Sequence, residues 1–343
     1  MTTGDYETRM YYVSKGIIMK TYITNYLIAA VIGLVAASGF QARGETVEPI
    51  KYGDMEQWVV RHLQESKVIG GKSKTLYAIG PTSTIDGSVP YTNRGGSPWA
   101  TSNVMAKVAG IVKGSNAVFP DNRDTGGRCC KLSTVMEQCK ALGMINIEVI
   151  VPGSIFLGSM LEPVKSTKNP YSKMEMGIPF TKRPKALQFD YRVEMPAKSD
   201  RIYAPGVGSQ KTIPGHDNSE VYIILQRRWE DENGNIYAKR VGTGREQYGK
   251  STDGWVNGHR IPVKYGDISK DPNFKSYMGL IPKGKSYYAR NSKGKMMPVT
   301  EVGWDTNDAT PTHLLIMASA GSGEAYVGTP GLTLWVDNFS LVY

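Results

Sequence analysis

Cysteine, histidine and phenylalanine are scarce in this chain of 343 residues, which holds 3 Cys, 4 His and 7 Phe. Successive residues on a strand face opposite ways, so at most one of Cys129 and Cys130 can point towards Cys139. An oxidising compartment would permit one disulfide, but we expect all three to be small buried hydrophobic residues. A zinc site would need further Cys or His residues close by, and the sequence has none there.

Catalytic and nucleotide-binding motifs are missing as well. The sequence has no G-x-S-x-G, and its histidines are scattered. Gly206-Val207-Gly208 lacks the strand–helix context of a nucleotide fingerprint. The net charge is +10, but no basic helix or RNA-binding aromatic box accompanies it, so we expect no nucleic-acid partner. The positive charge could favour binding of an acidic polysaccharide, but a role in solubility alone explains it equally well.

Apolar runs long enough to span a membrane are also missing. The longest, Tyr26–Ala37, has 12 residues, whereas a membrane helix needs about 20. Lys20 precedes this run and small residues follow it, which is the layout of a secretory signal peptide. We therefore predict an upstream extension at 1–18, a signal peptide at 19–44, and an exported protein that is periplasmic, cell-surface or extracellular.

Turn residues are plentiful, with 38 Gly and 19 Pro, while helical periodicity is rare. Alternation is clearest at Lys185–Val193, where apolar side chains occupy every second position on one face. A polar stretch at 80–103 reads as long N-terminal loops. This pattern predicts an all-β, jelly-roll type sandwich in one domain at 45–343. Further strands are expected at Lys74–Ile79, Arg128–Ser133, Met144–Val151, Val221–Trp229, Ile236–Val241, Leu314–Ala318 and Leu332–Tyr343.

The last predicted strand changes phase within itself. Leu334 and Val336 share one face, but the apolar positions continue at Phe339 and Leu341, which have odd numbers. One extra residue in a strand produces such a shift, which is the definition of a β-bulge. We therefore expect a bulge at Asp337-Asn338 that redirects the carboxylate towards the start of the domain.

Five short segments share their order and spacing with one known family. They are Tyr52–Trp58 (YGDMEQW), Ser97–Asn103 (SPWATSN), Gly177–Pro184 (GIPFTKRP), Leu187–Tyr191 (LQFDY) and Leu334–Leu341 (LWVDNFSL). Through these five segments the sequence resembles the bacterial putative carbohydrate metabolism domain family, whose members adopt a galactose-binding-like β-sandwich. The resemblance implies this fold and a role connected with carbohydrate, and it supports the fold better than any activity.

A looser similarity is to carbohydrate-binding modules of the same sandwich type. Many of these hold a structural calcium between their first and last strands. Their pattern matches Met55-Glu56 near the start and Asp337 in the closing strand. Calcium takes several oxygen ligands, so this similarity implies Glu56 and Asp337 as metal ligands. The alternative is that both carboxylates are solvated or hydrogen-bond a loop.

Tyrosine is abundant, with 20 residues. Proteins bind sugars with flat aromatic faces, and planar polar side chains beside them bind the hydroxyl groups. Trp99 lies in a family motif and is expected to be structural, and any single aromatic residue is more often core than ligand contact. The candidate sugar-binding residues, which have polar or Gly-rich neighbours, are Trp229, Tyr248, Trp255, Trp304 and Tyr326.

We therefore predict a secreted carbohydrate-binding, glycan-handling protein with a non-catalytic β-sandwich. Two alternatives stay open: a glycoside hydrolase or related polysaccharide-active enzyme, and a surface adhesion or scaffold protein. A hydrolase needs two carboxylates ~5–5.5 Å or ~6.5–9.5 Å apart. The sequence identifies no catalytic residue, because spacing along the chain does not define separations across strands.

Overall fold

Short strands form most of the regular structure in the computed structural model, which describes residues 44–343 except 94–95, 142–144, 199, 207 and 323. The all-β prediction is confirmed, since this part of the chain contains no α-helix. No described helix is long and apolar enough to cross a membrane. Apart from Gly44, the predicted extension and signal peptide lie outside the described residues. The 3-10 helices described are η1 (Lys67–Ile69), η2 (Pro170–Lys173) and η3 (Ser276–Met278).

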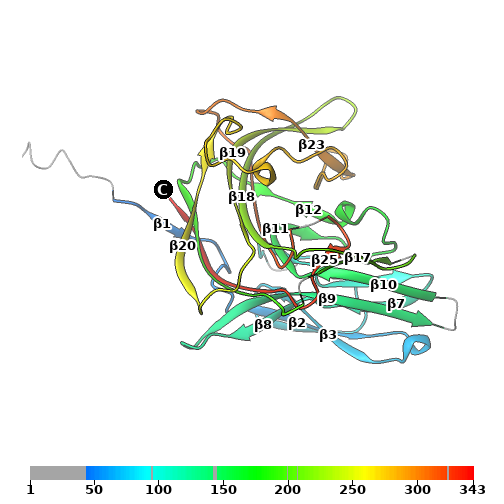
Figure 1. Ribbon diagram of the computed structural model, residues 1–343. Helices are drawn as coiled ribbons and strands as arrows, with labels where there is room; N and C mark the ends of the chain where they lie inside the picture. The colour runs from blue at the N-terminus through cyan, green and yellow to red at the C-terminus, as the bar shows by residue number, and fades with distance from the viewer. Residues whose placement is uncertain (1–43, 94–95, 142–144, 199, 207, 323) are drawn as a thin grey trace, which may run out of the picture. The chain divides into compact units, whose positions relative to one another are not determined.

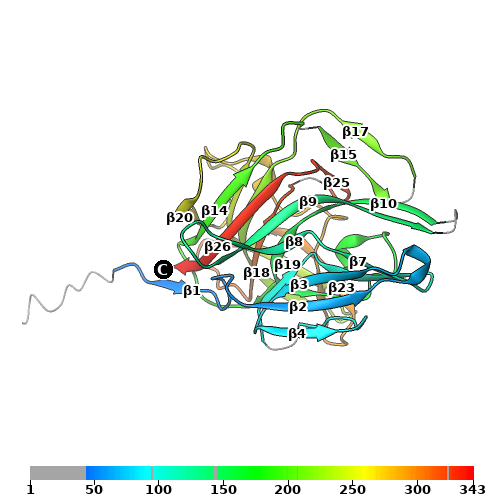
Figure 2. The ribbon, with the colours of Figure 1, turned by 90° about the horizontal axis from the view of Figure 1, so that it is seen from below.

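The first main sheet has eight strands in the order β16-β10-β9-β26-β14-β20, with β1 beside β26 and β8 beside β9. Its strands are β1 (Val47–Pro49), β8 (Val118–Asn122), β9 (Arg128–Ala141), β10 (Ile145–Pro152), β14 (Ala186–Glu194), β16 (Pro205–Gly206), β20 (Val256–Pro262) and β26 (Thr333–Val342). Figure 2 shows the closing strand β26 between β14 and β9, and it pairs antiparallel with both. The last strand of the chain is therefore central in its sheet.

The second main sheet has ten strands and closes on itself. Because β24 pairs with both β18 and β11, seven strands form a ring in the order β24-β18-β19-β23-β22-β12-β11. The ring strands are β11 (Ser154–Met160), β12 (Met174–Met176), β18 (Ser219–Glu230), β19 (Ile236–Tyr248), β22 (Tyr288–Arg290), β23 (Met296–Trp304) and β24 (His313–Ser319). The strands attached to the ring are β5 (Trp99–Thr101), β13 (Ile178–Pro179) and β21 (Lys264–Tyr265). The sequence predicted a jelly-roll type sandwich and no barrel, so the closed barrel is a finding of the structure.

Three small sheets complete the fold (Figure 1). They contain β2 (Trp58–Gln64), β3 (Ser73–Ile79) and β4 (Ser83–Asp86); β6 (Val104–Val108) and β7 (Ile111–Ser115); and β15 (Arg201–Tyr203), β17 (Lys211–Ile213) and β25 (Val327–Gly328). The stretch predicted as loop at 80–103 thus holds two short strands: β4, which pairs parallel with β2, and β5, which pairs antiparallel with β11. Backbone pairing stabilises a strand there despite the polar, Gly-rich sequence.

Two cores lie on opposite faces of the barrel wall. On β18, Val221 and Ile223 pack in the main core, which also contains Phe189 of the eight-stranded sheet. Tyr222 and Ile224, which alternate with them, belong to a second core formed by ring strands. Alternate side chains of a strand point to opposite faces. The eight-stranded sheet therefore packs against one wall of the barrel, and the second core fills part of the barrel interior.

The predicted bulge in the closing strand is confirmed. Asp337 of β26 is paired with Asp190 of β14, and the register then shifts, so that Asn338 and Phe339 together oppose the single residue Phe189. Asn338 has φ 54°, a left-handed conformation in which Asn is enriched among non-glycine residues. The shift returns Phe339 to the core, where its ring stacks on Phe189 with centroids 5.3 Å apart.

The three cysteines are free in the structure. Cys129 and Cys130 are buried, as expected for small hydrophobic residues, whereas Cys139 is half-buried. All three belong to β9. About nine residues of extended strand separate Cys139 from the other two, or ~30 Å, which is far beyond the reach of a disulfide.

Candidate functional site

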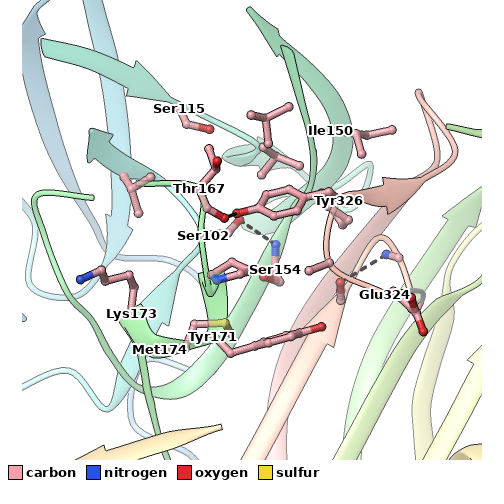
Figure 3. A pocket seen from close by; sticks show the side chains of 18 of the residues that line it. Ser102, Ser115, Ile150, Ser154, Thr167, Tyr171, Lys173, Met174, Glu324 and Tyr326 are labelled. Carbon is pink, nitrogen blue, oxygen red and sulfur yellow. Dashed lines mark hydrogen bonds between the residues drawn. The ribbon is translucent and has the colours of Figure 1, made fainter. Parts of the chain in front are cut away.

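A cavity of about 600 Å³ opens at one end of the barrel. It is lined by residues of the ring strands β11, β12, β18, β19 and β24, by β6, β7, β9 and β10, and by the segments at 164–173, 276–287, 321–322 and 324–326. Figure 3 shows side chains from these elements converging on it. Ligand pockets usually measure about 300–1,000 Å³ and often lie in the mouths of β-barrels. Size and place therefore make this cavity the candidate site.

The polar part of the lining comes from two neighbouring barrel strands. Glu220 of β18 is buried, and its Oε2 accepts hydrogen bonds from Arg245 Nη2 at 2.7 Å and from Gln247 Nε2 at 3.3 Å, both on β19. Arg245 Nη1 donates to the Tyr277 carbonyl at 2.8 Å. No described residue donates to Glu220 Oε1, so this oxygen remains an acceptor for a group in the cavity. Three planar polar side chains are thus held in one fixed arrangement.

Four tyrosines line the same cavity: Tyr171, Tyr277, Tyr287 and Tyr326. The Tyr222 hydroxyl, inside the barrel, donates to the Tyr287 hydroxyl at 2.5 Å. The only described acceptor near the Tyr287 proton is the Met317 sulfur, 4.0 Å away. Burial raises the pKa of Tyr287 to about 12, so this hydroxyl keeps its proton at neutral pH. Tyr287 can therefore donate a hydrogen bond into the cavity.

Tyr326 is the one predicted sugar-binding residue that lines the cavity. Its hydroxyl donates to the Thr167 carbonyl, and Figure 3 shows the ring extending towards that residue. The backbone of Tyr326 has φ 64°, which is uncommon for a bulky residue. This conformation and the hydrogen bond fix one aromatic face at the cavity wall.

The other predicted sugar-binding residues lie apart from the cavity lining. Trp229 on β18 is 43% exposed and stacks on Tyr237, with centroids 5.9 Å apart. Tyr248 ends β19 and stacks on Tyr191 at 4.5 Å. Both aromatics belong to strands, and the polar or Gly-rich residues near them in the sequence lie just beyond the strand ends.

Trp255 and Trp304 each lie against an arginine. The Arg123 guanidinium is 4.1 Å from the Trp255 ring centre, and the Arg240 guanidinium is 5.6 Å from that of Trp304. Trp255 precedes β20, and Trp304 is the last residue of β23. The structure therefore does not gather the five predicted aromatics at one place. Trp99, expected to be structural, is buried, and its indole N–H donates to the Lys51 carbonyl at 3.0 Å.

Asp337 belongs to a buried ion-pair cluster at the bulge. Arg123 Nη1 donates to Asp190 Oδ2 at 2.7 Å and to Asp337 Oδ2 at 2.8 Å. The other nitrogen, Nη2, donates to Asn257 Oδ1, while Asn338 Nδ2 donates to Asp190 Oδ2 at 2.8 Å. One arginine thus links the β8–β9 turn to two adjacent strands of the eight-stranded sheet.

Glu56 has a different partner from Asp337. Its Oε1 accepts a hydrogen bond from the backbone N–H of Arg128 at 2.9 Å. The described residues contain no group of three His, Cys, Asp or Glu that could hold a metal ion. Asp337 already pairs with Arg123 and Glu56 with the backbone, so these side chains as placed do not fit calcium, which takes six to eight oxygen ligands. The calcium site stays a prediction from the resemblance.

The Asp337 carboxylate gives the protein a pH-dependent stability. Burial raises its pKa from 3.8 to about 6, with Arg123 opposing the shift. The folded state therefore binds this proton more tightly, and the stabilisation is full below pH 4 and lost as the pH rises through about 6. Since one pKa unit is worth about 1.4 kcal/mol, we expect the wild type to lose about 1–3 kcal/mol relative to Asp337→Asn between pH 4 and pH 7.5.

Urea unfolding of both proteins at the two pH values measures this difference. Taking the difference between the proteins cancels the titration of all carboxylates that they share. An equal stability difference at pH 4 and pH 7.5 would contradict a raised pKa at Asp337.

Sequence reasoning missed the polar residues of the cavity. Glu220 directly precedes the predicted strand Val221–Trp229, whereas Arg245 and Gln247 lie beyond the predicted end of the next strand at Val241. Nothing in their spacing shows that β18 and β19 form part of a barrel wall. One usable signal was present. A glutamate directly before the apolar run that begins at Val221 is costly to bury without a cationic partner, and Arg245 supplies one.

No curated protein is similar enough to the chain to count as a relative. The fold is similar to a crystal structure described as a "putative glycoside hydrolase" from Bacteroides thetaiotaomicron, with 14% identity, TM-score 0.39, and 80% of this chain and 81% of the other covered. A second "putative glycoside hydrolase", from Bacteroides vulgatus, has 15% identity, TM-score 0.40, and coverage of 86% and 94%. The family model described as "Putative carbohydrate metabolism domain" matches residues 82–280, more than half of the chain, and the protein belongs to that family.

Proposed function

We propose that this protein binds a carbohydrate in the cavity at the barrel end and does not cleave it. The observation that carries the proposal is the combination of Glu220, Arg245 and Gln247 with four tyrosines in one cavity. Sugars present hydroxyl groups around an apolar ring face, and planar polar groups next to aromatic side chains complement both. The family membership supports carbohydrate as the class of ligand.

The carboxylates of the cavity support binding rather than cleavage. Each of the three is in an ion pair: Glu137 with Lys74 at 2.8 Å, Glu220 with Arg245 at 2.7 Å and Glu324 with Lys285 at 2.6 Å. Lys285 also lowers the pKa of Glu324. A glycosidase needs one carboxylic acid with a raised pKa to protonate the leaving group. Lys285 favours the opposite, ionised state at Glu324.

The test is a glycan array followed by titration calorimetry on the best hit. We expect Glu220→Gln and Gln247→Leu to weaken binding at least tenfold, because each removes hydrogen-bonding capacity or charge at the polar part of the lining. Trp229→Ala, which alters an exposed aromatic residue away from the cavity, is expected to change affinity less than twofold. Unfolding curves confirm that each variant folds.

Two results would overturn the proposal. The first is the absence of any glycan hit, which would favour the adhesion or scaffold alternative. The second is binding that Trp229→Ala abolishes while both cavity variants leave it unchanged, since the site would then be the outer surface. Either result can be read without knowing which glycan is bound.

A hydrolase remains the second candidate because of one carboxylate pair outside the cavity. Asp190 and Asp337 contact the same nitrogen of Arg123 at 2.7 and 2.8 Å, so these two oxygens are at most about 5.5 Å apart, which is too close for an inverting glycosidase and leaves only the retaining arrangement open. The Asp337 pKa is raised to about 6, as a general acid requires. Reducing-sugar release by the wild type that Asp337→Asn abolishes would favour this candidate.

We further propose that the eight-stranded sheet and the barrel wall facing it correspond to the galactose-binding-like sandwich implied by the resemblance. The core that the two share supports this. We also propose that the chain is exported with its leader removed, on the grounds of the apolar run and Lys20. N-terminal sequencing of the protein recovered from outside the cytoplasm tests the second point, and an intact Met1 would contradict it.

A further inference from the structure

The charged residues of the cavity lining are not balanced. Four are cations and three are carboxylates: Lys113, Lys173, Arg245 and Lys285 against Glu137, Glu220 and Glu324. Arg245 pairs with Glu220, while Lys113 lies 3.2 Å from Glu65 and 3.6 Å from Glu137. These two cations are therefore already engaged by protein carboxylates.

Lys173 is different from the other cations. It ends η2 and lines the cavity next to Tyr171 and Met174 (Figure 3). Within the part of the chain that the structure describes, no carboxylate lies within ion-pair distance of its amino group. The residue is half-buried. A lysine that lines a cavity and has no protein carboxylate beside it can pair with an anionic group of a ligand.

Lys285 is held only weakly. Its partner is Glu324 at 2.6 Å, but the two side chains are 48% and 70% exposed. An exposed pair of this kind contributes little to stability, so Lys285 can exchange Glu324 for another anion at little cost. The cavity thus offers two ammonium groups to an incoming ligand, one unpaired and one exchangeable.

We propose that the carbohydrate bound in this cavity is acidic, and that its carboxylate or sulfate groups pair with Lys173 and Lys285. This inference rests on the proposed function and specifies the class of glycan. The hydroxyl groups of the same glycan bind at Glu220, whose charge Arg245 already balances, so this carboxylate does not oppose an anionic ligand as an isolated one would. A neutral glycan would leave Lys173 without a counter-ion.

The experiment compares polymers that differ only in charge. Affinity electrophoresis uses polygalacturonate against its methyl ester for the carboxylate source, and dextran sulfate against dextran for the sulfate source. The variants are Lys173→Met, Lys285→Met and the double variant. Lys182→Met is the matched control: it removes the same charge from a site outside the cavity lining, where Lys182 pairs with Glu48 and is 57% exposed.

We expect the charged member of at least one pair to bind at least tenfold more tightly than its neutral partner. Lys173→Met is expected to weaken that binding about tenfold and the double variant further, while Lys182→Met changes it less than twofold. The polymer pair whose charged member binds more tightly shows whether the anionic group of the ligand is a carboxylate or a sulfate. Binding of the charged polymer is expected to fall with salt, since ion pairs near a surface are screened.

Other outcomes overturn the inference without affecting the proposed function. Glycan-array hits confined to neutral sugars would do so, as would equal binding of charged and neutral partners. Equal losses in Lys173→Met and Lys182→Met would show that the diffuse net charge, and not the cavity, attracts the polymer. An array without any hit removes the proposed function and this inference together.

Discussion

Replacing Arg240 with methionine is expected to lower the free energy of unfolding by about 3–5 kcal/mol. Arg240 and Glu301 form a two-pronged ion pair, with Nε–Oε1 and Nη2–Oε2 distances of 2.7 and 2.6 Å, and their side chains are 1% and 0% exposed. Glu301 also accepts hydrogen bonds from Gln226 and from the Ile281 backbone, both at 2.7 Å. Without Arg240, a buried carboxylate keeps these neutral partners but loses its counter-charge.

Urea unfolding measures the loss, and two further variants separate its causes. Arg227→Met breaks a bidentate pair with Asp305 in which the carboxylate is 3% exposed but the arginine is 49% exposed, so its expected cost is smaller than that of Arg240→Met. Combining Arg240→Met with Glu301→Leu removes both buried charges, and we expect this double variant to recover most of the stability. A loss below 1 kcal/mol for Arg240→Met alone would show that Glu301 does not need its partner.

The same ion pair also shapes the candidate site. Glu301 holds the backbone at Ile281, and Arg240 Nη2 approaches the Gly279 carbonyl at 3.4 Å. Gly279 and Ile281 both belong to the segment that forms one side of the cavity. The ion pair inside the barrel therefore helps to hold this side of the cavity in place. Loss of the pair should weaken glycan binding even in molecules that remain folded.

The strands were predictable because their patterns are local. From Leu187 to Glu194 the sequence alternates apolar and polar residues over eight positions, and the phase break before Phe339 located the bulge at Asn338. Both features depend only on the period of two that every strand has. Where one face of a strand is buried and the other is polar, the sequence alone is sufficient to predict the strand.

The barrel was not predictable for the opposite reason. Strand β24 is apolar at consecutive positions, because Leu314 and Ile316 pack in the main core while Leu315 packs inside the barrel. A continuous apolar run indicates burial on both faces but does not identify the neighbouring strands. The closure depends on the pairing of Phe156 with Met317, which are 161 residues apart in the sequence.

The residues of the cavity could also be predicted only in part from the sequence. Tyr326 was predicted from its aromatic character. Glu220 and Arg245 lie side by side only because β18 and β19 pair in a register that places Tyr222 opposite Arg245. The polar neighbours of Trp304 suggested an exposed platform, yet its ring lies against the buried Arg240. Composition indicates which residues suit a sugar, and only the pairing of strands shows which of them share a cavity.

Phe339→Ala is expected to cost about 3–5 kcal/mol, the range for removing a buried phenylalanine. The ring is 1% exposed, stacks on Phe189 at 5.3 Å and contacts Trp99 at 5.1 Å. Phe339 also exchanges backbone hydrogen bonds with the first turn of the domain, since its N–H donates to Gly53 and its carbonyl accepts from Ile50, both at 2.9 Å. Chemical unfolding with intrinsic fluorescence measures the change.

The size of the stability loss in Phe339→Ala also tests the role of the bulge. Phe119→Ala is the matched control, since this phenylalanine is only half-buried at the edge of the same sheet and should cost clearly less. Phe339→Leu keeps an apolar side chain at the position and should recover part of the loss. If Phe339→Ala cost no more than Phe119→Ala, the ring would not be packed in the core, and the left-handed residue at Asn338 would have no packing role. A large and specific loss would instead show that the bulge stabilises the domain by returning the closing strand to the core.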